Sequence, residues 1–86
     1  MVKITLYGTP NCQDTARSRN YMAALGIPFQ EVNVQEDKNA EMFVKLINQG
    51  NCSTPTIIVD PGTTTVILTD PSEDRLHHTL SMIYGH

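Results

Sequence analysis

The hydrophobic period changes several times along the 86 residues of this chain. Alternation of apolar and polar residues indicates a strand, and apolar residues three and four positions apart indicate a helix. The first half therefore predicts a strand, a helix, a second strand and a short amphipathic helix, over residues 2–7, 12–25, 29–34 and 37–48. Gly8 and Pro10 are expected to stop the first strand. The amphipathic helix is expected to pack into the core through one apolar face, formed by Met42, Phe43, Leu46 and Ile47.

The second half predicts two adjacent antiparallel strands and a final helix. Residues 56–60 and 64–68 are rich in β-branched side chains and flank a Pro-Gly break, which is typical of a β-hairpin. Asp70 is expected to cap the last helix, with Pro71 as its first residue and Glu73 as its third. The buried stripe of this helix is predicted to contain Leu76, Leu80 and Ile83.

The order β-α-β-α-β-β-α predicts an α/β fold, in a single domain over residues 1–86. The net charge is −3, and the six basic residues are scattered, so the chain has no basic stripe to follow a nucleic-acid backbone. No apolar run approaches the roughly 18 residues of a membrane span, and the start lacks the apolar core of a signal peptide. We therefore expect a cytoplasmic protein that binds neither nucleic acid nor membranes.

Cys12 is the residue most indicative of chemistry, because it lies where the first strand gives way to the first helix. Free N–H groups and the positive end of the helix dipole at such a position favour a thiolate over a thiol. A buried, inert cysteine is the alternative interpretation. The only other cysteine is Cys52, and two cysteines are too few for a disulfide framework.

Histidine residues do not predict a metal site. His77 and His78 are adjacent on a helix and point to different faces, and neither they nor His86 have a carboxylate or cysteine at ligand spacing. We expect no bound metal.

The strand–Cys12–helix opening, the Thr54-Pro55-Thr56 segment and the element order together resemble the glutaredoxin branch of the thioredoxin fold. Within this branch, the residues around Cys12 resemble the redoxins that supply ribonucleotide reductase, and the Thr-Pro segment resembles mycoredoxins. The resemblance implies a three-layer sandwich around a four-stranded mixed sheet. It also implies a thiol–disulfide oxidoreductase in which Cys12 is the nucleophile and attacks a disulfide through a mixed-disulfide intermediate.

The chain departs from the two-cysteine pattern of this family at Thr15, which stands where dithiol members have their second cysteine. Thr15 cannot form a disulfide, so the resemblance implies a monothiol mechanism in which an external thiol releases the product. The Thr15 hydroxyl is expected either to donate a hydrogen bond to the Cys12 thiolate or to bond only to backbone. Cys52 is either a resolving thiol or an ordinary loop residue.

The resemblance also implies the substrate-binding residues. Thr54-Pro55 matches the cis-proline element, whose backbone pairs with an extended substrate. The start of the last helix, with Asp70, Ser72 and Glu73, matches the segment that holds the γ-glutamyl end of glutathione. Thr9 stands where many relatives have a lysine, and Asn11 and Gln13 flank Cys12, so these three residues are expected to face the substrate.

We expect a monomer without a cofactor, with glutathione or another low-molecular-weight thiol as co-substrate and disulfide-containing proteins as possible partners. Two other functions stay open. One is a non-catalytic module that binds peptides or thiols, and the other is an enzyme of the arsenate-reductase type, which normally has a longer helical insertion. The Cys-Gly-Phe-Ser signature of relatives that bind iron–sulfur clusters is absent.

Overall fold

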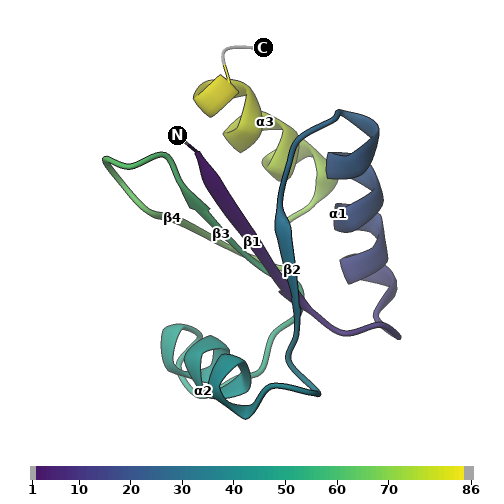
Figure 1. Cartoon of the computed structure of the whole chain (residues 1–86), viewed down its shortest axis with the longest axis vertical. Helices are drawn as coiled ribbons and strands as arrows, with labels where there is room; N and C mark the ends of the chain where they lie inside the picture. The colour runs from purple at the N-terminus through teal and green to yellow at the C-terminus, as the bar shows by residue number, and fades with distance from the viewer. Residues whose placement is uncertain (1, 85–86) are drawn as a thin grey trace.

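The computed structural model describes residues 2–84. Three helices and four strands follow one another in the predicted order (Figure 1). They are β1 (Lys3–Gly8), α1 (Gln13–Ala24), β2 (Gln30–Asn33), α2 (Lys38–Ile47), β3 (Thr56–Asp60), β4 (Val66–Thr69) and α3 (Glu73–Tyr84).

The four strands form one mixed sheet in the order β2-β1-β3-β4. β1 pairs with β2 in parallel, and the β1–β3 and β3–β4 pairs are antiparallel. Tyr7 lies opposite Thr56, and Thr56 lies opposite Thr69 on its other side. The end of β1, the start of β3 and the end of β4 therefore meet at one end of the sheet, where the segments that follow or precede them come together.

One face of the sheet is covered by α1 and α3. Alternate strand residues point to this face, and Ile4, Leu6, Ile57, Val59 and Leu68 are buried there. They contact Met22 of α1 and the predicted stripe of α3, in which Leu76 and Leu80 are buried and Ile83 packs against the cluster. This confirms the predicted stripe of the last helix.

The opposite face carries α2, which completes the three predicted layers. Ala40 and Val44 of α2 form a small cluster with Val34, against which Tyr7 and Val32 pack. Tyr7 alternates with the buried Leu6 along β1, so its side chain points away from the α1–α3 layer. The whole arrangement confirms the predicted α/β sandwich.

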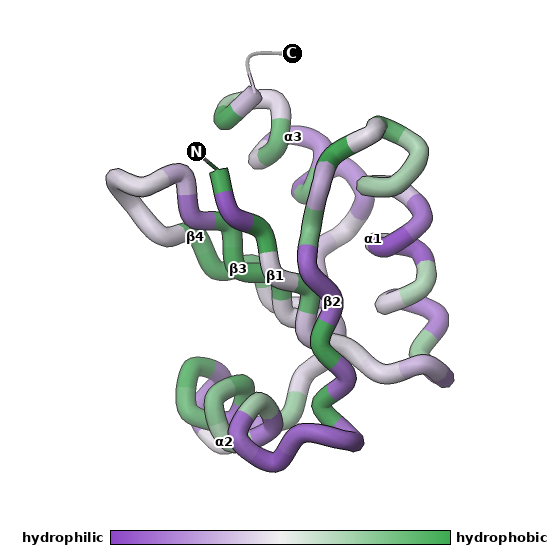
Figure 2. The backbone as a smooth tube through the Cα atoms, viewed as in Figure 1, coloured by the Kyte–Doolittle hydropathy of each residue, from purple (hydrophilic) through white to green (hydrophobic). Residues whose placement is uncertain are grey.

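The prediction that α2 packs into the core through Met42 and Leu46 is wrong. These side chains are 66% and 80% exposed, although Figure 2 shows the turns of α2 as largely apolar. The smaller Ala40 and Val44 face the sheet instead, and Phe43 stays partly exposed, with its ring centroid 5.4 Å from that of Tyr7. Amphipathic spacing identified the helix but not the side of it that is buried.

Several boundaries also differ from those expected, and β4 begins at Val66 rather than at residue 64. Gly8 belongs to β1 as its last residue and pairs with Asn33, so it does not stop the strand. Asp70 does not cap α3: it lies before the helix with φ 44°, and the Ser72 hydroxyl accepts the N–H of Arg75 at 3.1 Å. Ser72 is therefore the N-cap, because a cap side chain accepts from the residue three positions on.

Candidate active site

Cys12 is the N-cap residue of α1, with an extended backbone (φ −90°, ψ 120°). A tight turn brings the chain there from β1, and the Cys12 N–H donates to the Thr9 carbonyl oxygen at 3.3 Å. The Cys12 carbonyl oxygen accepts the N–H of Ala16 at 3.1 Å and so begins the helix. Its side chain makes no capping hydrogen bond, which leaves the sulfur available for chemistry.

The segment that enters β3 faces this sulfur. The Cys12 thiol donates to the carbonyl oxygen of Thr54 at 3.8 Å, and the Thr54-Pro55 peptide bond is cis, which confirms that expectation. Cys12 is half-buried and Pro55 is buried. The thiol therefore lies against the backbone that the resemblance assigned to substrate binding.

The surroundings of Cys12 lower its pKa below the ordinary value of a cysteine thiol. The side chain of Thr15 is the largest cause, because its hydroxyl stabilises the thiolate, and partial burial opposes it. The backbone N–H of Thr15, the Thr54 side chain and the backbone N–H of Asp14 lower the pKa further. The start of α1 thus favours the nucleophilic form of sulfur.

Thr15 is fully buried one turn into α1. Its Oγ1 has no hydrogen-bond partner among residues 2–84. The described structure therefore contains neither of the two hydrogen bonds expected for Thr15, to the Cys12 sulfur or to backbone. The Thr15 side chain is nevertheless the largest influence that lowers the pKa of Cys12.

The start of α3 adjoins the same site. The Asp70 N–H donates to the Pro55 carbonyl oxygen at 2.8 Å, so the β4–α3 turn is held against the cis-proline segment. Ser72 and Glu73 follow at the exposed N-terminus of α3. Four predicted residues, Cys12, Thr54, Pro55 and Asp70, are therefore connected through hydrogen bonds and the Thr54-Pro55 peptide bond, and Thr15 influences the pKa of Cys12 from the first turn of α1.

The other predicted residues lie around this group. Thr9 is in the turn before Cys12, and Asn11 and Gln13 are exposed on either side of it. Cys52 is exposed in the loop before Thr54, and both cysteines are free thiols. No disulfide joins Cys52 to Cys12 in the described part of the chain.

Sequence reasoning missed Asn48, whose side chain ties the loop before Thr54 to two strands. Asn48 Nδ2 donates to Thr56 Oγ1 at 3.1 Å, and Thr69 Oγ1 donates to Asn48 Oδ1 at 2.7 Å. Thr56 Oγ1 in turn donates to the Ser53 carbonyl oxygen at 2.7 Å. An asparagine at the end of a helix was the only signal, and its partners come from strands that the chain reaches later.

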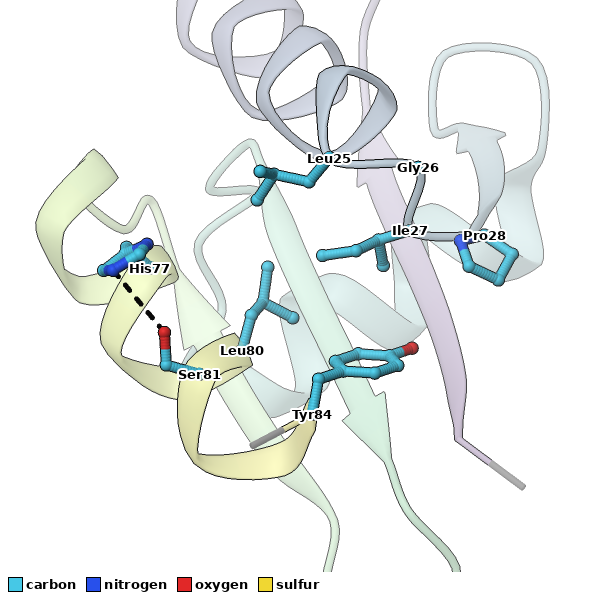
Figure 3. Close-up of a pocket in the computed structure, with 8 residues that line it drawn as sticks. All are labelled: Leu25, Gly26, Ile27, Pro28, His77, Leu80, Ser81 and Tyr84. Atoms are coloured by element: carbon cyan, nitrogen blue, oxygen red, sulfur yellow. Dashed lines mark hydrogen bonds between the residues drawn. The ribbon is translucent and has the colours of Figure 1, made fainter. Parts of the chain in front are cut away.

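A cavity at the other end of α1 includes none of the predicted site residues (Figure 3). Its volume is about 450 Å³, and it is enclosed by the α1–β2 turn and by α3. His77 stands at its edge, with Nδ1 2.6 Å from the Tyr21 hydroxyl and Nε2 3.5 Å from Ser81 Oγ. Since α1 has 12 residues, about 18 Å of helix separates this cavity from Cys12.

Within residues 2–84, no three histidine, cysteine, aspartate or glutamate side chains gather as a metal site. His77 and His78 lie within this range, and His86 lies outside the described residues. No helix in the same range is long and apolar enough to cross a membrane.

Comparison with known proteins connects this geometry to a family. Two Mycobacterium tuberculosis proteins, from strains CDC 1551 and H37Rv and each named as a candidate glutaredoxin, are 33% identical over 82 residues, which is 95% of this chain and 94% of theirs. The solved thioredoxin-like protein BC3987 superposes with a TM-score of 0.73 at 21% identity, covering 88% of this chain and 97% of that one. A glutaredoxin from Archaeoglobus fulgidus gives 0.68 at 18% identity, covering 93% and 87%.

The structural matches share the fold of this chain, a four-stranded mixed sheet with three helices. The family model for glutaredoxins matches residues 4–62, which include β1, the turn at Cys12, α1 and the cis-proline segment. On the strength of this match and of the mycobacterial relatives, the chain belongs to the glutaredoxin family.

Proposed function

We propose that this protein is a monothiol thiol–disulfide oxidoreductase in which Cys12 is the only catalytic cysteine. The observation that carries the proposal is the buried Thr15 hydroxyl beside Cys12, where a dithiol enzyme would have its second thiol. This hydroxyl stabilises a thiolate but cannot form a disulfide with it. Membership of the glutaredoxin family supports a redox function, and Thr15 restricts the proposed mechanism to a single cysteine.

The reaction then has two thiol–disulfide exchanges. The Cys12 thiolate attacks one sulfur of a substrate disulfide, a new S–S bond forms on Cys12, and the other sulfur leaves as a thiolate. A thiolate from solution then attacks the substrate-derived sulfur of the mixed disulfide, the S–S bond to Cys12 breaks, and Cys12 leaves as a thiolate. In the sum, one sulfur of the substrate disulfide is released as a thiol, and the other forms a disulfide with the external thiol.

Substrate binding is proposed to use the backbone of Thr54 and the start of α3. The carbonyl oxygen of Thr54 lies against the Cys12 sulfur, and an extended thiol-containing peptide can pair with this backbone as an added strand does at a sheet edge. The exposed N–H groups around Ser72 and Glu73 suit a carboxylate of such a peptide. Thr9, Asn11 and Gln13 are proposed to line the rest of the binding site around Cys12.

Glutathione or another low-molecular-weight thiol is proposed as the co-substrate, and the enzyme needs no further cofactor. Thr9 offers a hydroxyl where a lysine would attract a carboxylate, so binding of the glycine end of glutathione rests on hydrogen bonds rather than on charge. The protein is proposed to act as a monomer.

The proposal is tested by incubating the reduced protein with oxidised glutathione and measuring intact masses. The wild type and the Cys52→Ser variant are expected to gain one glutathione, and Cys12→Ser none. Added reduced glutathione should then remove the adduct, and turnover should be measured with 2-hydroxyethyl disulfide and glutathione.

Two other outcomes would favour different functions. A loss of two protons without an adduct in the wild type, abolished in Cys52→Ser, would assign Cys52 as a resolving thiol. No adduct and no turnover at neutral pH would leave a non-catalytic module that binds peptides or thiols.

A further inference from the structure

Gly8 has an environment unlike that of the other described glycines. Gly26, Gly50 and Gly62 have φ values of 70°, 94° and 100°, and a Cβ added to any of them would have no atom within 4 Å. These three are required by backbone conformation. Gly8 has no positive φ, and a Cβ built on it would overlap Thr15 Cγ2 and lie 2.6 Å from Thr15 Oγ1 and 3.0 Å from Thr15 Cβ. Gly8 is required instead because a side chain at this position would overlap Thr15.

The backbone of Gly8 is held on its other side. Gly8 pairs with Asn33 in the parallel β1–β2 ladder, and its carbonyl oxygen accepts the N–H of Val34 at 3.0 Å. A methyl group at this position therefore cannot be accommodated by moving the strand alone. The side chain of Thr15 would have to move, because it is the only side chain among the three nearest contacts.

Thr15 in turn has little room to move. It is fully buried, and its hydroxyl has no hydrogen-bond partner among the described residues. A buried hydroxyl without a partner is unfavourable, so its presence calls for a compensating role. Stabilisation of the thiolate of Cys12, three residues earlier, is such a role.

We propose that Gly8 is a positioning residue for the nucleophile: lacking a side chain, it lets Thr15 pack against β1 with its hydroxyl directed at the Cys12 sulfur. This inference rests on the proposed function and adds a residue that does not touch the substrate. The dominant contribution of the Thr15 side chain to the lowered pKa of Cys12 agrees with it. Charged neighbours do not offer another explanation, since Asp14 and Arg17 at the same helix start are paired with each other at 2.9 Å.

The experiment measures the pKa of Cys12 from thiolate absorbance near 240 nm as a function of pH. Cys52→Ser serves as the background, so that one thiol titrates. In this background Thr15→Ala is expected to raise the pKa of Cys12 by about 1, because a hydrogen bond to the charged form is lost. Gly8→Ala is expected to raise it by a similar amount, and to cause no further rise when Thr15 is already alanine.

The Thr15→Ala background also guards against misfolding of Gly8→Ala, because alanine lacks both atoms, Cγ2 and Oγ1, that lie nearest the added methyl. If Gly8→Ala alone does not fold, the inference requires that Gly8→Ala with Thr15→Ala folds, and failure of this double variant to fold overturns it. The inference is also overturned if folded Gly8→Ala keeps the original pKa, or if Gly8→Ala raises the pKa as much in the Thr15→Ala background.

These results are independent of the test of function. The absorbance titration needs no disulfide substrate, so the positioning role can fail in an enzyme that forms the glutathione adduct and turns over normally. Conversely, the pKa values can follow the expected pattern in a protein that forms no adduct.

Discussion

Helices α1 and α2 lie on opposite faces of the same sheet, and in neither helix does hydrophobicity alone account for which side chains are buried. The buried residues of α1 are Thr15, Ser18 and Met22, two of which are polar. On α2 the large apolar residues Met42 and Leu46 remain exposed. The helix with the weaker apolar pattern is therefore the one that is built into the main core.

The difference follows from what each helix packs against. The start of α1 lies against the end of β1 at a glycine, and the side chain of Thr15 fills the space that the glycine leaves. α2 covers one end of the other face and needs only Ala40 and Val44 to do so. Burial thus depends on the distance to the neighbouring layer as well as on hydrophobicity.

The largest effect on the free energy of unfolding is expected when one methionine in each of the two helices is replaced by alanine. Met22 is completely buried in α1, and its loss leaves a cavity, so Met22→Ala should lower the free energy of unfolding by about 2–5 kcal/mol. Met42→Ala is the matched control and should change it by no more than about 0.5 kcal/mol. Urea denaturation measures both, and comparable losses would contradict the distinction between the helices.

The next effect concerns how α2 and the cis-proline segment are joined. Asn48→Ala removes hydrogen bonds to the hydroxyls of Thr56 and Thr69, and Thr56 is fully buried. We expect a loss of about 1–3 kcal/mol in the free energy of unfolding. Alanine substitution of the exposed Asn51 is the control. Equal stability of the two variants would show that the hydrogen bonds of the Asn48 side chain do not stabilise the fold.

A smaller effect is expected from pH at the start of α1. The pKa of Cys12 is lowered in the folded protein, so the fold favours the thiolate. This contribution is fully present above the unfolded pKa of about 8.5 and is lost as the pH falls through the lower pKa of the folded state. The difference in unfolding free energy between wild type and Cys12→Ser should therefore move in favour of the wild type as the pH rises from about 6 to about 9.

The Thr15→Ala variant sharpens this pH experiment. Without the hydroxyl, the folded and unfolded pKa values of Cys12 should lie closer together, and the pH dependence should flatten. If the difference in unfolding free energy between wild type and Cys12→Ser does not change with pH, the fold does not favour the thiolate.

The three layers follow from the family resemblance, whereas local patterns in the sequence predict the order of the elements and the placement of Cys12 at the start of a helix. These depend on local periodicity and on turn residues, which act over a few positions. The stripe of α3, with Leu76 and Leu80, was predictable for the same reason. Thr15 was recognisable as a departure because it lies at a fixed spacing from Cys12.

Only the tertiary structure decided which side chains the site brings together. It showed that Gly8 makes room for Thr15, that Asn48 joins two strands to the loop before the cis-proline, and that Ser72 rather than Asp70 caps α3. It also showed that Met42 and Leu46 face away from the core. Such contacts depend on distances between layers and on strand register, and these join residues far apart in the chain that no local pattern relates.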